Sequence, residues 1–295
     1  MKRFVILLLL WVSIAAAQGT SSGAAFLKLP LHPRVASLGE ALIADQGSIP
    51  SLILNPSNIF GIQQSEVSIS HTQWIQDIAS QELIAAIPFD IGTCGIAVSS
   101  TSVSGIEIRD IPGPPSGTFD ARAAAFEGIV ATEIVSQVSA GVGFKYLYEK
   151  IYVEEHSGLG VDAGITYRTP FEGLSVGASL VNAGSLEAVK SIRSDLPQRF
   201  LFGGSYQFKH EDFGLASYLG YDVEKKPNPN RLLAGLECSY QSLLFVRAGY
   251  RSGDESRLWS FGLGVRYSMI SADYAVVPFS LSLGNASLIS LAIRF

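Results

Sequence analysis

Charged side chains are scarce in this chain of 295 residues: only 16% are Asp, Glu, Lys or Arg, against about 25% in an average soluble domain. Long apolar runs are missing as well. Although 47% of the residues are hydrophobic, no stretch reaches the length of about 18 apolar residues that a transmembrane helix needs. Such a chain can still cross a membrane if its apolar residues alternate along β-strands.

Residues that carry common chemistry are also few. Cys94 and Cys238 belong to no CxxC pair, so we predict neither a disulfide framework nor a zinc site and interpret both as small apolar strand residues. The four histidines are scattered, and nothing selects a catalytic pairing such as His71 with Asp77. No basic run occurs, so nucleic acid is not an expected partner. We therefore expect no enzyme and no cofactor.

Residues 1–17 predict a secretory signal peptide. A basic start at Lys2 and Arg3 precedes an apolar core and the small-residue cleavage site Ala15–Ala17. The apolar core is too short to span a bilayer. We expect the mature chain to begin at Gln18.

From residue 63 onward apolar and polar residues alternate, and a period of two predicts β-strands. In one clear case, Phe261 and Val265 oppose Gly262 and Arg266. We predict about 14 strands, at residues 66–74, 80–88, 92–101, 119–131, 136–150, 158–168, 173–183, 198–208, 212–223, 229–240, 243–251, 257–268, 270–278 and 286–295.

The links between the predicted strands differ in length according to whether they follow an odd-numbered or an even-numbered strand. Links after odd-numbered strands, except the first, are longer, as at 102–118, 151–157 and 184–197, whereas links after even-numbered strands are mostly tight. Long loops at one end and short periplasmic turns at the other are typical of outer-membrane barrels. A soluble β-sandwich, the alternative, has no reason to sort its links. The sequence thus favours an all-β fold, with an antiparallel transmembrane β-barrel of about 14 strands over residues 63–295.

The two faces of the strands predict a lipid side and an interior side. We expect Phe144, Tyr146, Val161, Phe261 and Val265 to face lipid, and Gly143, Asp162, Gly262 and Arg266 to face inward. Interior charges could line a pore, but they need partners where water is scarce. We therefore expect them to pair with one another and with a plug; they are Lys145, Glu149, Asp162, Arg168, Arg199, Asp222, Glu237, Arg247, Arg251, Arg266 and Arg294.

Residues 18–62 do not alternate, and they are mostly apolar and irregular. Such a segment must be buried, and the polar interior of a barrel is the natural place. We expect a plug-like segment in the periplasmic half of the lumen, held by Arg34 and by a turn at Asn55 and Pro56. Pro56 biases Asn55 toward an extended backbone, and the Asn side chain can bond nearby backbone.

This segment resembles the N-terminal signature of the PorV/PorQ family of outer-membrane proteins. The matching stretches are Phe26–Leu29, Pro33–Ala41, Asp45 and Leu54–Pro56, with Arg34, Gly39, Asp45, Asn55 and Pro56 as the plug motif. Where the family usually has Asn-Pro-Ala-Gly-Leu, this chain has Asn-Pro-Ser-Asn-Ile at residues 55–59. The amphipathic last strand ends on Phe295, which resembles the signal that the outer-membrane assembly machinery reads.

The resemblance implies a fold similar to that of FadL-type fatty-acid transporters, in the bacterial outer membrane and in contact with its lipid. It further implies a non-channel barrel that docks cargo or surface partners for type IX protein secretion. The alternative is FadL-like uptake of hydrophobic small molecules, and a third possibility is a purely structural barrel. A continuous apolar pocket, lined by side chains such as Leu147, Leu201 and Leu243, would suit uptake. A lumen filled by the plug and by paired charges would suit docking.

Overall fold

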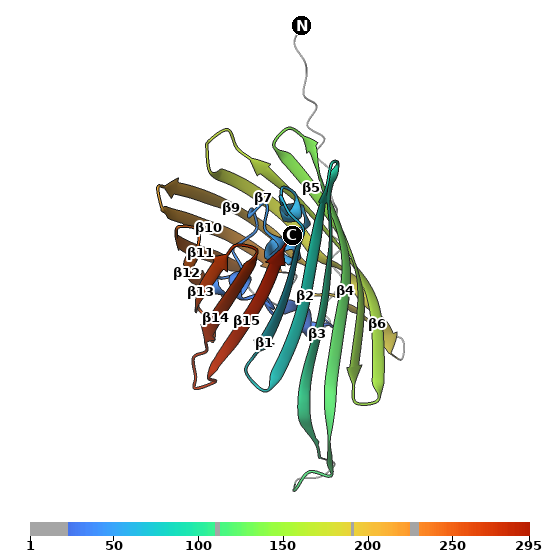
Figure 1. Cartoon of the computed structure of the whole chain (residues 1–295). Coiled ribbons are helices and arrows are strands. Elements are labelled where there is room, and N and C mark those ends of the chain that lie inside the picture. The colour runs from blue at the N-terminus through green and yellow to red at the C-terminus, as the bar shows by residue number, and fades with distance from the viewer. Residues whose placement is uncertain (1–22, 110–112, 190–191, 225–229) are drawn as a thin grey trace.

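The computed structural model describes residues 23–109, 113–189, 192–224 and 230–295, so the predicted signal peptide lies outside the described residues. Strands dominate, and a few helical turns precede them (Figure 1). The turns are η1 (Ala25–Lys28), α1 (Pro33–Ser37), η2 (Ile49–Ile53) and η3 (Pro56–Ile59). No helix in this described part is long and apolar enough to cross a membrane.

The strands follow one another in sequence order around the molecule. They are β1 (Glu66–Gln73), β2 (Ile78–Phe89), β3 (Gly92–Ile108), β4 (Gly117–Val135), β5 (Val138–Ile151), β6 (Glu154–Arg168), β7 (Leu174–Val189), β8 (Ile192–Asp195), β9 (Arg199–His210), β10 (Phe213–Glu224), β11 (Arg231–Tyr240), β12 (Leu244–Arg251), β13 (Trp259–Tyr267), β14 (Ile270–Pro278) and β15 (Asn285–Arg294).

The sheet closes on itself. The first strand, β1, pairs antiparallel with the last, β15, from Glu66 opposite Arg294 to Gln73 opposite Ser287, and β6 pairs with β7. The short strand β8 pairs antiparallel with the end of β7 and lies outside the ring. Closure removes the open edges that would otherwise invite pairing with another chain. The predicted antiparallel barrel of 14 strands is therefore confirmed, with β8 as an additional strand.

The predicted division into two faces is confirmed. Phe144 on β5 is 65% exposed on the outer face, whereas Asp162 on β6 is 0% exposed inside. The other residues follow the same rule: Tyr146, Val161, Phe261 and Val265 are exposed outside, and Gly143, Gly262 and Arg266 face the interior. An apolar outer wall around a polar lumen is the arrangement that a bilayer requires of a barrel.

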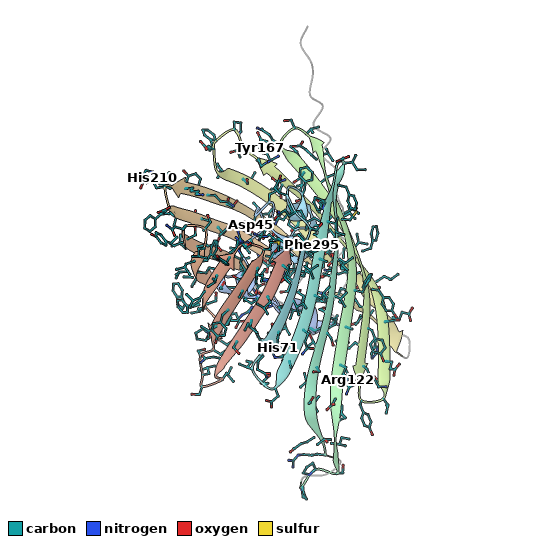
Figure 2. All side chains as sticks on the ribbon, in the orientation of Figure 1. Asp45, His71, Arg122, Tyr167, His210 and Phe295 are labelled. Atoms are coloured by element: carbon teal, nitrogen blue, oxygen red, sulfur yellow. The ribbon has the colours of Figure 1, made fainter. Side chains whose placement is uncertain are left out.

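The two ends of the barrel differ. Tyr167 and His210 lie near the end with the short turns, and Arg122 lies toward the opposite end (Figure 2). The turn between β2 and β3 consists of residues 90–91, whereas the link between β3 and β4 consists of residues 109–116. Since short turns face the periplasm in outer-membrane barrels, we assign this end to the periplasm, and the protein to the outer membrane.

The predicted long links are shorter in the structure, because the strands continue into them. Residues 102–108 and 117–118 pair in β3 and β4, so the predicted link 102–118 is wrong over most of its length. Likewise β5 and β6 leave only residues 152–153 unpaired. Beyond the bilayer both faces of a hairpin meet water, so the apolar alternation that identifies a strand is lost there.

The lipid-facing position of Val161 can be tested by an arginine substitution. A charged side chain at the bilayer midplane of a barrel costs about 2–4 kcal/mol. Val161→Arg should lower the free energy of unfolding in lipid vesicles by that amount. Val153→Arg, at an outer turn where the side chain is already 74% exposed, should change it little. Equal effects of the two substitutions would show that the lipid-facing side or the membrane depth of these residues is misassigned.

The plugged lumen as candidate functional site

Residues 23–62, which we call the plug, lie inside the barrel (Figure 1). Their backbone is irregular because turn-forming residues interrupt it. Pro33 opens α1, whose first turn is capped by the ring of His32 accepting the Arg34 N–H. After α1, Gly39 and Glu40 both adopt left-handed backbone, with φ of 63° and 61°. Such a conformation is uncommon for a non-glycine residue, so the fold must hold Glu40 in place.

The plug runs through both halves of the lumen, so its expected confinement to the periplasmic half is wrong. At its start the Gly23 N–H donates to the carbonyl of Asp195, in the outer link after β7. Lys28 pairs with Glu224 at the outer end of β10, with 2.6 Å between Nζ and Oε1. A non-alternating segment gives no period from which its depth in a barrel can be read.

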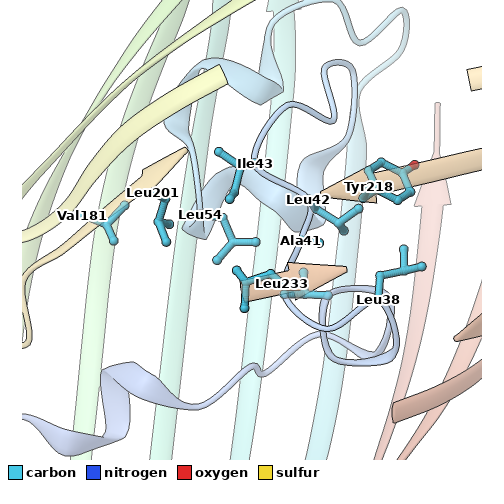
Figure 3. Packing of buried hydrophobic residues seen from close by; sticks show 10 residues of the cluster. Leu38, Ala41, Leu42, Ile43, Leu54, Val181, Leu201, Tyr218 and Leu233 are labelled. Atoms are coloured by element: carbon cyan, nitrogen blue, oxygen red, sulfur yellow. The ribbon is translucent and has the colours of Figure 1, made fainter. Parts of the chain in front are cut away.

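Side chains of the plug and the wall share one apolar cluster. Figure 3 shows plug residues Leu38, Ala41, Leu42, Ile43 and Leu54 packed against wall residues Val181, Leu201, Tyr218 and Leu233. All of them are buried, with at most 2% of each side chain exposed. The plug therefore contributes one half of a dry core and the wall the other half.

Glycines on eight successive barrel strands let backbone and side-chain atoms of the plug approach the wall closely. They are Gly141, Gly164, Gly177, Gly203, Gly220, Gly235, Gly249 and Gly262, on β5, β6, β7 and β9 to β13. A Cβ on any of them would come closer than 3.0 Å to a plug atom, for example 2.7 Å to the Leu38 carbonyl oxygen from Gly235. These glycines form the contact surface of the plug.

Arg34 joins the plug to the wall. Its guanidinium donates to Asp45 and to Ser48 Oγ (2.8 Å) within the plug. It also donates to the wall, with Nε 3.1 Å from Glu237 Oε2 and Nη2 3.0 Å from the Tyr218 hydroxyl. The predicted residues Arg34 and Asp45 thus lie in direct contact. A guanidinium is suited to this position because it spreads five donors over one plane.

Glu40 forms a second junction, which the site prediction did not include. Its carboxylate accepts hydrogen bonds from Arg251, from Arg257 at 3.0 Å and from Arg199 at 3.2 Å, three arginines that come from separate parts of the wall. Although burial by itself favours the protonated form, Arg251 and Arg199 hold the pKa of the Glu40 carboxyl below its ordinary value of 4.5. A glutamate in an otherwise apolar segment that must be buried is the sequence signal that could have identified Glu40.

The predicted turn at Asn55 and Pro56 lies against β6. Asn55 has an extended backbone, and its Oδ1 accepts the Ser57 N–H at 3.1 Å. Its Nδ2 donates to the Ile43 carbonyl at 2.8 Å and to Thr166 Oγ1 at 3.1 Å. In the next two residues the sequence departs from the family pattern, and both contact Thr166: Ser57 Oγ lies 2.8 Å and Asn58 Oδ1 lies 3.1 Å from Thr166 Oγ1.

Most of the predicted interior charges have partners. Lys145 pairs with Asp162 at 2.6 Å, Arg199 with Asp222 at 2.8 Å, and Arg294 with Glu66 at 2.6 Å. Arg231 donates to both Asp222 and Glu224, and Arg168 pairs with Glu133 outside the lumen. Glu149 and Arg266 differ, because neither side chain forms an ion pair or hydrogen bond with any described residue, and Arg266 Nε is buried without a partner.

The residues considered for chemistry lie apart. His71 is exposed, and its Nδ1 lies 3.4 Å from Nε2 of Gln81. Cys94 and Cys238 are exposed on separate strands. Within the described ranges no group of three His, Cys, Asp or Glu side chains is arranged to hold a metal ion. Phe295, the predicted assembly signal, is exposed, and its N–H donates to the Ser65 carbonyl.

The plug divides the free space of the lumen. A cavity of about 950 Å³ opens on the periplasmic side, and one of about 60 Å³ lies between the plug and the outer half of the wall. The suggested apolar pocket of Leu147, Leu201 and Leu243 is not formed. Leu147 and Leu201 pack in different clusters, and Leu243 lies in the turn after β11. The molecule is thus a plugged barrel of the outer membrane.

No known family model matches the chain, and no curated protein matches it. Several solved barrels share its fold. The CymD monoaromatic hydrocarbon channel superposes with a TM-score of 0.65 at 13% identity, covering 90% of this chain and 97% of the channel. The Pseudomonas putida toluene transporter TodX superposes with a TM-score of 0.58 at 11% identity, covering 84% of this chain and 94% of the transporter. A Pseudomonas aeruginosa FadL homologue superposes with a TM-score of 0.56 at 11% identity, covering 90% of this chain and 98% of the homologue. The chain therefore has the fold of these outer-membrane barrels.

Because plug and wall are in close contact, even a methyl side chain added at one of these glycines should lower the stability of the fold. Adding a methyl group to a tightly packed site costs about 1–3 kcal/mol, so Gly249→Ala should lower the free energy of unfolding by this amount. Gly128→Ala is the matched control, since a Cβ there has no heavy atom within 4 Å. Urea unfolding of both variants in lipid vesicles measures the difference, and an unchanged stability of Gly249→Ala would argue against the contact.

The Glu40 junction predicts a pH-dependent stability. Because the folded-state pKa lies below the unfolded value, the carboxylate stabilises the fold at neutral pH, and this contribution is lost as the pH falls through the folded-state pKa. Glu40→Gln should cost about 3–5 kcal/mol at pH 7, and its difference from wild type should shrink below about pH 4.5. Glu107→Gln, which removes an exposed pair with Arg109, should cost at most about 1 kcal/mol. A pH-independent difference for Glu40→Gln would contradict the assignment.

Proposed function

We propose that this barrel passes small hydrophobic molecules across the outer membrane. The observation that carries the proposal is the cavity at the outer end of the plug. Phe26, Leu29 and Leu31 of the plug face Ala97 and Ala125 of the wall across it. Its lining also includes charged groups, but apolar side chains form most of it. The likeness in fold to barrels named as a monoaromatic hydrocarbon channel and a toluene transporter supports the same function.

In the conformation described, this cavity is too small for a ring-sized solute. Its volume is about 60 Å³, whereas an apolar cavity that binds benzene measures about 150 Å³. Phe26 is buried in one apolar cluster with the small residues Ala123 and Ala125 and with Leu147. In this proposal the Phe26 side chain must move to admit a ring-sized solute. The Arg34 and Glu40 junctions continue to block water and ions below it.

Truncation of Phe26 tests the proposal. Phe26→Ala should raise the uptake of radiolabelled toluene severalfold in cells whose own copy of the gene has been deleted, because the cavity then approaches the size of the solute. Phe171→Ala removes the same side chain from an exposed periplasmic turn and should leave uptake at the wild-type rate. Uptake that is the same with and without the wild-type barrel would refute the proposal.

A second candidate is partner docking for protein secretion, which the resemblance to the PorV/PorQ family suggests. What favours it is the filled lumen, in which a plug fixed by ion pairs at Arg34 and Glu40 leaves no continuous apolar route. Neither candidate requires catalysis or a cofactor. Docking predicts that deletion of the gene traps secreted proteins in the periplasm while toluene uptake is unchanged. Normal secretion in the deletion strain would rule this candidate out.

A further inference from the structure

The periplasmic cavity of about 950 Å³, which we call the periplasmic chamber, has a charged lining that the proposed function does not use. Its walls are the inner face of the plug, the periplasmic ends of the strands from β9 to β15 and β1, and the turn after β6. A volume near 950 Å³ lies within the range of about 300–1,000 Å³ that small-molecule sites occupy. The chamber is therefore large enough for a ligand, and its charges decide which kind.

The carboxylates deep in the chamber already have partners. Asp45 pairs with Arg34, and Glu237 accepts from both Arg34 and Arg247. Asp273 pairs with Arg247, and Glu66 pairs with Arg294. The ring of His32 also lines the chamber, but burial lowers its pKa to about 4, so it is neutral at pH 7. Glu172 and Lys209 also line the chamber and are exposed to water. Of the lining arginines, Arg34, Arg247 and Arg294 take part in these pairs, and Arg266 does not.

Arg266 on β13 lines the chamber without a counterion. None of the ion pairs or hydrogen bonds of the described residues involves its guanidinium, and its Nε is buried without a hydrogen-bond partner. Its charged neighbours are Arg294 and Arg34, which carry the same sign, and Glu66 and Asp273, whose ion pairs are with Arg294 and Arg247. A partly buried cation without a partner is costly, and an unsatisfied buried donor calls for an explanation.

The guanidinium of Arg266 is nevertheless held in position. It lies over the ring of Phe245, 5.1 Å from the ring centroid, and Arg247 lies 5.4 Å from the same centroid. Stacking on an aromatic ring compensates a cation only in part. It does fix the direction of the planar donor fork, and a donor that is already oriented binds its acceptor with less loss of entropy.

We propose that the periplasmic chamber binds a small organic monocarboxylate, with the ligand carboxylate on the guanidinium of Arg266. An arginine without an ion-pair partner favours an anionic ligand, and the guanidinium fork matches the geometry of a carboxylate. A flat ring attached to that carboxylate would find Phe245 beside it. This site goes beyond the proposed function, because its occupation at equilibrium requires no passage through the barrel.

The test compares two ligands of the same shape and different charge. Benzoate and benzamide are titrated by calorimetry into the purified full-length barrel in detergent, at pH 7 and constant ionic strength. Benzoate should bind at least about tenfold more tightly, as expected of a charge-assisted hydrogen bond. Equal affinity for the two ligands, or no binding of benzoate, would overturn the proposal, and this comparison needs no variant.

Two charge-matched variants locate the site. Arg266→Gln should abolish the preference for benzoate over benzamide. Arg122→Gln removes an exposed arginine on β4 that lies outside the chamber and should keep the preference. Retention of the preference in folded Arg266→Gln would contradict the assignment to this residue. A loss of toluene uptake in cells would leave all of these results unchanged, so the two proposals fail separately.

Discussion

The carboxylate of Glu40 is the counterion of three arginines that face the lumen from separate parts of the wall. In a space of low dielectric a buried charge is tolerated only with its partner, and removing one member of a buried pair costs about 3–5 kcal/mol. The wall therefore depends on the plug for its electrostatic balance. In turn, the plug holds Glu40 in a left-handed backbone conformation that few residues of its type adopt.

Shape and charge fix the plug together. The glycine-lined half of the wall brings the backbone of the plug close enough to exclude water, and the junctions at Arg34 and Glu40 fix it along the barrel axis. The consequence is a lumen whose outer and periplasmic cavities differ in character. The outer one is small and mostly apolar, and the periplasmic one is large and charged. Each cavity therefore suits a different class of molecule.

The sequence predicted the barrel well, because each strand carries its own evidence. Alternation at positions such as Phe261 and Arg266 identifies both a strand and its two faces. At the outer hairpin of β3 and β4 the predicted strands are shorter than the observed ones. Beyond the bilayer both faces of a hairpin meet water, so the alternation is lost there. The likeness to the PorV/PorQ family stays a prediction, because the solved structures that share the fold are named as other barrels.

The candidate site was predictable only in part. Arg34 and Asp45 stand out as charges in an apolar segment, and the structure places them in contact. The role of Gly249 or Gly235 depends on which plug atom lies opposite, and strand periodicity holds no information about that. The unpaired state of Arg266 likewise follows from the pairing of every carboxylate around it. Such properties belong to the assembled lumen and cannot be read from any single stretch of sequence.

The central claim is that the plug is a fixed part of the barrel's core, and hydrogen exchange tests it most directly. Amides of residues 41–60 should exchange in detergent or lipid vesicles as slowly as those in the middle of β5 and β6, because they open only when the barrel opens. The amides of Leu281 and Ser282, in the exposed outer link between β14 and β15, provide the fast reference. Exchange of residues 41–60 at the rate of that link, in an otherwise protected barrel, would contradict the account.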